Sequence, residues 1–469
     1  MSTDIPKLVA ELRDKQPEWE ALGVAGRVKW LRKYAQWLLD NEARLVDALA
    51  ADVGKPRVEA AIEFIVPVDV IKYYTGNAEK FLEVEHPAPH NLLNAPKRVS
   101  VTHRPYPVVG VITPWNFPLG LSLCDAVPAL LAGAAVVIKP ASDTPNSVLA
   151  AVAGWAEIGA PPIFTAIASG GPAIVDEVDY VQFTGSTETG KRIAERCAQR
   201  LIPCGLELGG KDPAIVLADA DLEITARGIA WGALSNAGQM CTSVERVYVE
   251  APIYDEFVAK LSDRVAQLRR DIEIGPLVTE DQFALVKRHI DEALSAGARL
   301  TTGGDADEAA RWISPAVLVD VDHTMACVSE ESFGPLIPVM KVADEDEAVR
   351  LANDSVFGLS ASVWTSDIRR GERIAARLEA GAVNINDSHA NLFYFPAPMH
   401  GWKESGMDGR FGGKSGVLKY TRPQTVTAPR LPLTYQQYVL WFPYNDTVAD
   451  VLTRSLRVLA ATGIRRIVR

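Results

Sequence analysis

The sequence predicts an α/β fold built on parallel, doubly wound sheets. From residue 108 onward, short apolar runs alternate with helical segments, which is typical of βαβ units. These runs are mostly apolar, as expected of strands that are covered on both faces. The chain has 469 residues, more than one hydrophobic core organises. We therefore expect two or three domains.

The first hundred residues are predicted to be helical, then irregular. Leu, Ala, Arg and Trp recur at helical spacing over residues 7–50, which predicts two or three amphipathic helices. A further helical stretch covers residues 59–82. Several prolines indicate a loop over residues 84–98, and alternating β-branched residues predict extended chain over residues 98–111.

Two sets of α/β elements follow. The first set has predicted strands at 108–113, 134–139 and 180–183, and helices at 119–131, 146–158 and 187–200. The second set has elements at 214–217, 226–236, 246–249, 254–268, 282–296, 337–342, 345–352, 360–364 and 367–378.

Composition excludes several classes of function. The 48 basic and 59 acidic residues give a net charge of −11, which argues against general nucleic-acid binding. The five cysteines are widely spaced, with no Cys-x-x-Cys pair and no Cys/His ligand spacing, so we expect no disulfide framework and no metal site. Residues 1–6 lack a signal pattern and no run approaches eighteen apolar residues, so we expect a cytoplasmic protein.

Two motifs point to covalent catalysis. Cys241 lies in residues 238–243, Gly-Gln-Met-Cys-Thr-Ser, and Glu207 begins the string Glu-Leu-Gly-Gly-Lys. A thiolate can attack an electrophilic carbon, and a carboxylate can activate the water that later releases the product. A cysteine alone is more often an inert buried side chain, and a glutamate alone is usually solvated. The argument rests on the two motifs together.

With these motifs the chain resembles the NAD(P)-dependent aldehyde dehydrogenase superfamily from about residue 15 to about residue 428. The resemblance implies that Cys241 is the nucleophile and Glu207 the general base for hydrolysis. It also implies that Asn116, in the motif of residues 113–118 (Thr-Pro-Trp-Asn-Phe-Pro), donates to the oxyanion together with the backbone N–H of Cys241. The product is then a free carboxylic acid.

The resemblance also assigns a dinucleotide site. Its cofactor-binding residues are expected to be Thr113, Trp115, Lys139, Ser142, Gly185, Ser186, Leu208, Glu331 and Phe333. Ser186 and the helix that follows would contact the diphosphate. Glu331 would bind the nicotinamide ribose, with Phe333 near the nicotinamide ring.

Ser142 bears on the choice of cofactor. Many NAD-preferring members of the family carry a glutamate at this position, where it binds both ribose hydroxyls. A hydroxyl removes the repulsion of a 2′-phosphate, and Lys139 could then neutralise that phosphate. The cofactor is therefore expected to be NAD or NADP, with NADP tolerated or preferred.

The family resemblance implies an aldehyde dehydrogenase-like domain organisation: a Rossmann-type dinucleotide-binding domain, an α/β catalytic domain and a small β arm for oligomerisation. The dinucleotide-binding domain would comprise residues 1–97 and 107–209, the arm residues 98–106 and 417–428, the catalytic domain residues 210–416, and a C-terminal extension residues 429–469. A homodimer or homotetramer is implied.

The sequence constrains the substrate and the binding partners less than it constrains the reaction. Residues 125–130, residues 235–239 and Ser142 are most similar to actinobacterial succinate-semialdehyde dehydrogenases, while aromatic residues such as Phe117 and Tyr394 suit an aromatic or aliphatic aldehyde. A catalytically silent homologue is a third reading, which retention of all three catalytic residues opposes. Residues 432–469 combine aromatic residues with a basic amphipathic stripe. This tail would dock against a neighbouring subunit or, alternatively, an anionic membrane surface.

Overall fold

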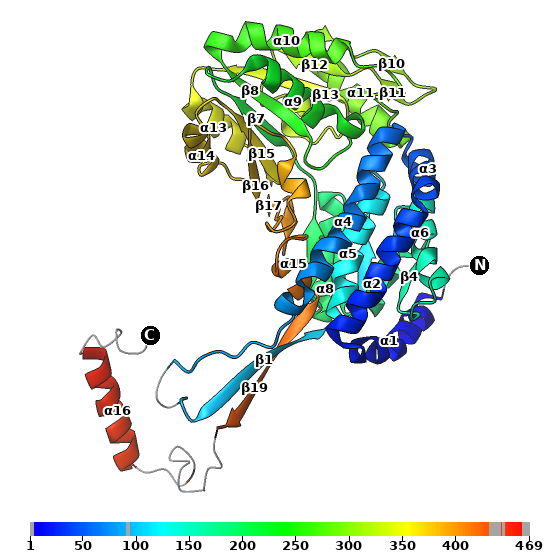
Figure 1. Ribbon diagram of the computed structural model, residues 1–469. Coiled ribbons are helices and arrows are strands. Elements are labelled where there is room, and N and C mark those ends of the chain that lie inside the picture. Colours follow the sequence, from blue (N-terminus) through cyan, green and yellow to red (C-terminus); the bar gives the residue numbers. More distant parts are fainter. Residues whose placement is uncertain (1–3, 91–93, 431–441, 443–445, 462–469) are drawn as a thin grey trace. The chain divides into compact units, whose positions relative to one another are not determined.

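The computed structural model describes residues 4–90, 94–430, 442 and 446–461. The chain divides into two units. Unit 1 comprises residues 1–83 and 103–422, and unit 2 comprises residues 84–102 and 423–469. Unit 1 contains two large sheets, each in its own lobe (Figure 1).

The first lobe is built on a six-stranded sheet with the order β18-β6-β5-β2-β3-β4. Five strands are parallel, and β18 joins β6 antiparallel. The strands are β2 (Val108–Ile112), β3 (Ala135–Lys139), β4 (Phe164–Ala166), β5 (Tyr180–Thr184), β6 (Cys204–Glu207) and β18 (Gly406–Met407).

Helices surround the six-stranded sheet of this lobe (Figure 1). They are α1 (Ile5–Ala21), α2 (Gly23–Asp40), α3 (Glu42–Val53), α4 (Arg57–Phe81), α5 (Pro118–Ala132), α6 (Asn146–Glu157), α7 (Gly171–Glu177), α8 (Thr187–Arg200) and the short α15 (Ser415–Leu418). Helix α4 packs against both α2 and α5. The N-terminal end of α4 reaches the second lobe, because the Glu59 carboxylate accepts the Asn236 N–H at 2.8 Å.

The second lobe is built on a seven-stranded sheet with the order β16-β15-β7-β8-β13-β12-β9. All pairs are parallel except the edge pair of β12 with β9. The strands are β7 (Asp212–Val216), β8 (Val244–Glu250), β9 (Arg299–Thr302), β12 (Ala316–Val319), β13 (Leu336–Val342), β15 (Ser360–Trp364) and β16 (Ala382–Ile385). Its helices are α9 (Leu222–Leu234), α10 (Tyr254–Ala266), α11 (Glu280–Ser295), α12 (Ala326–Ser329), α13 (Glu345–Asn353) and α14 (Ile368–Ala375). Two short antiparallel pairs complete unit 1: β10 (Ala306–Asp307) with β11 (Trp312–Ile313), and β14 (Phe357–Gly358) with β17 (Trp402–Lys403).

Local signals explain where several helices begin. The Asp221 carboxylate caps α9 by accepting the amides of Glu223 and Ile224 at 3.0 and 3.1 Å, and the Ser186 hydroxyl caps α8. Each lobe has its own hydrophobic core, and the buried parallel strands form the centre of each core. The predicted α/β fold with parallel sheets is confirmed.

The structure corrects several element predictions. Sequence patterning missed six strands of the two large sheets, β4, β6, β9, β12, β16 and β18, and the short helices α7, α12 and α15. Strand β4 has only three residues, too few for a periodic signal. The antiparallel edge strands β9 and β18 also differ from the all-parallel expectation. Glu207 is the last residue of strand β6.

Unit 2 contains most of a two-stranded sheet, in which β1 (Lys97–Pro105) pairs with β19 (Thr421–Pro429), and helix α16 (Asp446–Ala461). Helix α16 begins five residues before the apolar stripe that predicted it. Most of the tail's aromatic residues and its last arginines lie outside the described residues. No helix in the described part of the chain is long and apolar enough to cross a membrane.

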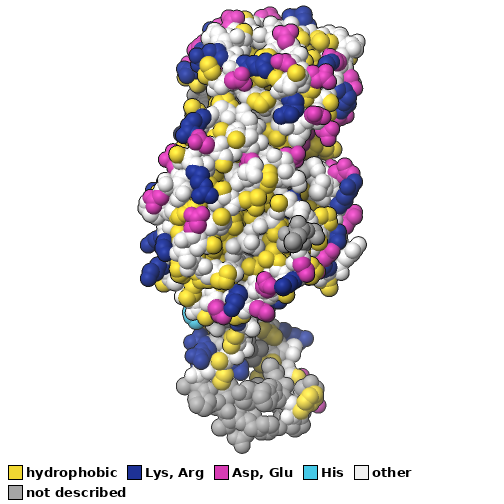
Figure 2. Space-filling view, turned by 90° about the vertical axis from the view of Figure 1, so that its right-hand side faces the viewer, with side chains coloured by type: hydrophobic (Ala, Val, Ile, Leu, Met, Phe, Trp, Pro, Cys, Tyr) yellow, Lys and Arg dark blue, Asp and Glu magenta, His cyan; other side chains and the backbone are white. Residues whose placement is uncertain are grey.

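Surface charge on unit 1 is mixed. On the face shown in Figure 2, acidic and basic side chains are interspersed with hydrophobic ones, and neither sign of charge gathers into one patch. Among the described residues, no cluster of three or more His, Cys, Asp or Glu side chains is placed to hold a metal ion.

Candidate functional site

Cys241 follows a strained turn in the seven-stranded lobe. The preceding short 3-10 helix η1 (Ser235–Gly238) contains three consecutive residues with positive φ: Asn236 (52°), Ala237 (55°) and Gly238 (74°). A Cβ at Gly238 would lie 2.2 Å from a backbone carbonyl oxygen, so only glycine fits there. Left-handed non-glycine residues cost about 1 kcal/mol or more each, so the surrounding contacts must hold this turn.

Asn116 lies beside this turn. It follows β2, immediately before α5, and is 2% exposed. Its Nδ2 donates to the Gln239 carbonyl oxygen at 2.9 Å, two residues before Cys241. The Cys241 amide makes no backbone hydrogen bond to any residue that the structure describes. The structure therefore brings the two predicted oxyanion donors to one turn.

Glu207 is buried at the end of β6. Its residue is 1% exposed, and neither carboxylate oxygen has a hydrogen-bond partner of normal geometry among the described residues. Burial raises the pKa of Glu207 to about 7, while the positive charges of Arg410 and Lys419 oppose the rise. A carboxyl with this pKa can accept and release a proton near neutral pH.

The thiol and this carboxyl act on each other. Burial and, to a smaller extent, the negative charge of Glu207 raise the pKa of Cys241 to about 12, while the positive charge of Arg410 opposes the rise. An ionised Glu207 carboxylate therefore disfavours the Cys241 thiolate. This interaction indicates that the two sequence-predicted residues lie near one another.

The paired glycines after Glu207 are required by close contacts. A Cβ at Gly209 would lie 2.7 Å from the Glu331 carboxylate, and a Cβ at Gly210 would lie 2.2 Å from the Cys241 carbonyl oxygen. The Gly210 N–H donates to the Glu331 carboxylate at 2.9 Å. Residues 207–211 thus pass between Glu331 and the turn of residues 235–241, which we call the nucleophile turn. A side chain at either glycine would push Glu331 and this turn apart.

The other predicted cofactor residues gather at one edge of the six-stranded sheet. Thr113 follows β2, Lys139 ends β3, Gly185 follows β5 and Leu208 follows β6, all at the carboxyl ends of parallel strands. This edge is where open α/β sheets bind ligands. Ser186 adds the start of α8, whose amides and dipole suit a phosphate group.

Two further features fit a dinucleotide. The Thr184 hydroxyl at the end of β5 is buried without a hydrogen-bond partner in the described structure. At the other end of the site, Trp115 meets Phe333 edge-to-face with ring centroids 5.4 Å apart, and Phe333 has a φ of 49°. Burial raises the pKa of Glu331 to about 8, while the hydrogen bond from the Gly210 N–H opposes the rise.

Lys139 ends β3, and Ser142 lies three residues after it. The Lys139 ammonium donates to the Pro140 carbonyl oxygen, burial lowers its pKa, and Asp143 opposes that shift. Ser142 is exposed, and its side chain carries a hydroxyl in place of a carboxylate. A 2′-phosphate would thus compete with a backbone carbonyl for Lys139.

Several buried charged residues escaped the sequence prediction. Arg410 donates to Asp125 at 2.9 Å, and both are almost fully buried. Lys211 donates to Glu245 at 2.6 Å, and that carboxylate accepts the Phe333 amide at 2.8 Å. These partners are far apart in the chain, and no local pattern marks a charged residue as buried.

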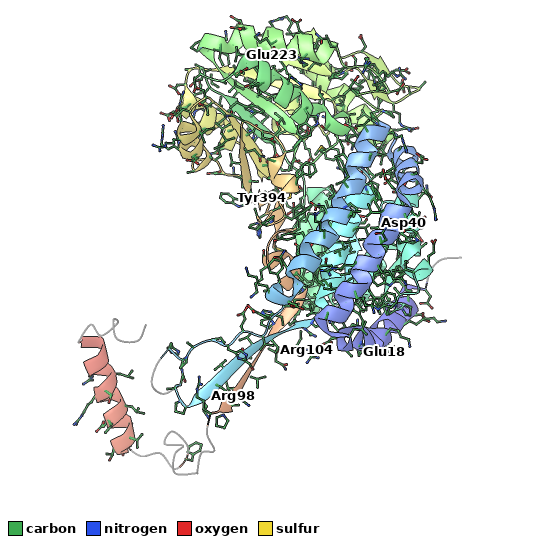
Figure 3. The ribbon with its side chains drawn as sticks, viewed as in Figure 1. Glu18, Asp40, Arg98, Arg104, Glu223 and Tyr394 are labelled. Carbon is green, nitrogen blue, oxygen red and sulfur yellow. The ribbon has the colours of Figure 1, made fainter. Side chains whose placement is uncertain are left out.

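Apolar side chains are exposed on the loop after β16. Phe393 is 48% exposed and Tyr394, labelled in Figure 3, is 63% exposed. Trp231 on α9 is 50% exposed and meets the buried His389 at 4.9 Å between ring centroids. Cys124 is 1% exposed within α5.

Comparisons with known proteins cover both lobes. The model of the Aldehyde dehydrogenase family matches residues 1–426. A relative from Mycobacterium ulcerans, named "Putative succinate-semialdehyde dehydrogenase (NADP+) 2", is 40% identical over 91% of this chain and 85% of its own length. The 4,4'-diapolycopene aldehyde oxidase of Methylomonas sp is 36% identical over 91% of this chain and 82% of its own. The solved structure of lactaldehyde dehydrogenase from Escherichia coli is similar with a TM-score of 0.86 and 33% identity, covering 91% of each chain.

Proposed function

Because the chain belongs to the aldehyde dehydrogenase family and oxidises an aldehyde to a carboxylic acid with NAD(P)+, we propose that Cys241, Asn116 and Glu207 carry out this reaction. The observation that carries the proposal is the close packing of the two motifs, in which a Cβ at Gly210, three residues after the buried Glu207, would lie 2.2 Å from the Cys241 carbonyl oxygen. Their proposed roles follow from the chemistry of each group and from its place in the site.

The Cys241 thiol loses its proton to solvent water, and its sulfur attacks the aldehyde carbon, forming a carbon–sulfur bond. The aldehyde oxygen becomes an oxyanion held by the Asn116 side-chain amide and the Cys241 N–H. When bound, the nicotinamide supplies the hydride acceptor, which oxidises the carbon to a thioester. Glu207 then takes a proton from water, the resulting hydroxide attacks the thioester, and the carbon–sulfur bond breaks to release the acid.

The proposed assignment of domains follows the two lobes. The six-stranded lobe would bind the dinucleotide through the edge that carries Thr113, Lys139 and Ser186. The seven-stranded lobe would supply Cys241 and the nicotinamide-side residues Glu331 and Phe333. Division at residue 209 or 210 then places the glycines of the Glu207 string at the boundary between the lobes.

We propose succinate semialdehyde as the substrate. Relatives named for it are about 40% identical over most of both chains. A carboxylate on the substrate needs a cation, and Arg410 is the candidate because its charge acts on both Cys241 and Glu207. Its Nε has no hydrogen-bond partner among the described residues.

A second candidate is an apolar aldehyde. Asp125 already pairs with Arg410 at 2.9 Å and offsets its charge. The exposed Phe393 and Tyr394, together with a relative named for oxidation of a diapolycopene aldehyde, favour a hydrophobic substrate.

A matched pair of substrates separates the candidates. Butanal has the carbon chain of succinate semialdehyde without its carboxylate. If a buried cation recognises that carboxylate, kcat/KM for succinate semialdehyde exceeds that for butanal by at least about tenfold, since losing a charged hydrogen bond costs at least about 1.4 kcal/mol. The rate of NADPH absorbance increase measures both. Equal or greater kcat/KM for butanal rejects succinate semialdehyde and supports the apolar candidate.

We propose NADP+ as the preferred cofactor, in line with the names of the mycobacterial relatives and the exposed hydroxyl at Ser142. Ser142→Glu should shift the ratio of kcat/KM values toward NAD+ by about tenfold or more, because a carboxylate repels the 2′-phosphate and can accept ribose hydroxyls. Initial rates with each cofactor at saturating aldehyde measure the ratio. An unchanged ratio, or a wild-type enzyme inactive with NADP+, rejects this role of Ser142.

We propose that the C-terminal extension docks against a neighbouring subunit of a homodimer or homotetramer. Its helix α16 exposes Val451 and Leu456, each 57% exposed, on a segment that also carries Arg454 and Arg457. Burial of these apolar side chains would favour association. An anionic membrane surface is the alternative partner for the same combination of apolar and basic residues.

A further inference from the structure

Lys55 and Glu63 form a fully buried ion pair next to Asn116. Lys55 precedes α4 and Glu63 lies within it, with side chains 0% and 1% exposed. The Lys55 ammonium donates to the Glu63 carboxylate at 2.7 Å and to the Asn116 backbone carbonyl at 2.9 Å. It also lies 3.8 Å from the centre of the Phe117 ring. All three contacts lead to Asn116 or to residues that hold its segment.

Glu63 fixes the segment from its other side. Its second carboxylate oxygen accepts the Gly120 N–H at 2.9 Å, in the first turn of α5. A Cβ at Gly120 would come within 3.1 Å of the Glu63 side chain, so the helix start is packed directly on this carboxylate. The backbone is thus held on both sides of Asn116, at its own carbonyl and four residues later.

The next acidic residue on the same face of α4 holds the nucleophile turn. Glu59, one turn before Glu63, accepts the Asn236 N–H at 2.8 Å. The Asn236 side chain donates to the Asn116 carbonyl at 3.1 Å. The Asn116 carbonyl therefore receives a donor from each lobe, Lys55 from one and Asn236 from the other. Both oxyanion donors are tied to one end of α4.

Stability alone does not account for a buried ion pair in this place. Removing two charges from water is costly, and well-packed uncharged residues of similar size are often as stable or more so. Nor is Lys55 free to act on a substrate. Its three N–H donors are directed at the carboxylate, the carbonyl and the ring face, and no described cavity includes it.

We infer that Lys55 and Glu63 are positioning residues, which fix Asn116 at the distance from Cys241 that the oxyanion requires. The inference rests on the proposed role of Asn116. It goes beyond that role because it assigns a purpose to two residues that touch neither substrate nor cofactor. A displacement of about 1 Å in such a donor can cost on the order of 100-fold in rate.

The test is a double-mutant cycle. It replaces Lys55 and Glu63 together, so that neither charge is left buried without its partner. In Lys55→Met/Glu63→Gln, the glutamine oxygen keeps an acceptor for the Gly120 N–H. We expect kcat to fall by about 10- to 100-fold, with KM for NADP+ and the thermal midpoint close to wild type. When Asn116 is already alanine, the same pair of changes should cost less than about threefold, because the donor that it positions is gone.

A matched control lies two residues away. Arg57 pairs with Asp47 on the surface at the start of α4, so Arg57→Met removes an ion pair from the same helix end without touching Asn116. It should leave kcat unchanged. If the buried double variant does not fold, Glu63→Gln alone is carried through the same cycle.

The outcomes separate this inference from the proposed function. An equal loss of kcat in the wild-type and Asn116→Ala backgrounds overturns the positioning role, as does an unchanged kcat in the buried variant. If Asn116→Ala alone has wild-type kcat, the proposed oxyanion role of Asn116 fails first, and the inference fails with it.

Discussion

Cys241→Ala abolishes aldehyde-dependent reduction of the cofactor. Without the sulfur no thiohemiacetal forms, so hydride transfer has no substrate-derived intermediate to act on. Loss of a covalent nucleophile lowers kcat by at least about 10⁴-fold in comparable enzymes. Absorbance of NADPH measures the effect, and equilibrium binding of NADP+ should be preserved.

Cys124→Ala is the matched control for this prediction. Cys124 is buried in α5, and burial raises the pKa of its thiol to about 12, as for Cys241. It lies apart from the strained turn that carries Cys241, and its loss should change kcat by less than about threefold. Substantial turnover by Cys241→Ala, or loss of turnover in Cys124→Ala with the fold intact, would contradict the assignment.

Glu207→Gln stalls the enzyme after one round of hydride transfer. The amide cannot take a proton from water, so the thioester persists and steady-state kcat falls by about 10²- to 10⁴-fold. Rapid mixing should still show a burst close to one equivalent of NADPH per active site, because acylation precedes the step that needs this base. A steady-state rate equal to wild type rejects the role.

The same variant should also change the pH profile. The pKa of Glu207 is about 7, so its carboxyl is neutral below that pH and ionised above it. Base catalysis needs the ionised form, and kcat in the wild-type enzyme should therefore rise as pH increases through about 7. Glu207→Gln should lose this inflection. An identical inflection in the variant would assign it to another group.

The main outline of the fold could be predicted because it rests on local patterns. The buried strands β2 and β3 are almost entirely apolar, and the predicted family and reaction class are confirmed. The motif around Glu207 could be recognised because its two glycines are required by close contacts with Glu331 and Cys241. Constraints of this kind fix the residue types in a short stretch of sequence, so they can be recognised there.

The supporting residues could not be predicted because their partners are distant in the chain. Lys55 and Asn116 are separated by 61 residues, and Arg410 and Asp125 by 285. A lysine or arginine in a sequence is expected at the surface, and nothing adjacent to Lys55 shows that it is buried. The sequence prediction missed the edge strands β4 and β18 for a different reason, because each is too short to show a period.

The central claim is that the substrate is carried on Cys241 as a thioester, and mass spectrometry of Glu207→Gln tests it most directly. After mixing with aldehyde and NADP+ and quenching in acid, the protein should gain the mass of one acyl group, localised to the peptide that contains Cys241. The adduct should be absent from Cys241→Ala/Glu207→Gln. Formation of one equivalent of NADPH with Cys241 unmodified, or an acyl group on any other residue, would contradict the covalent mechanism.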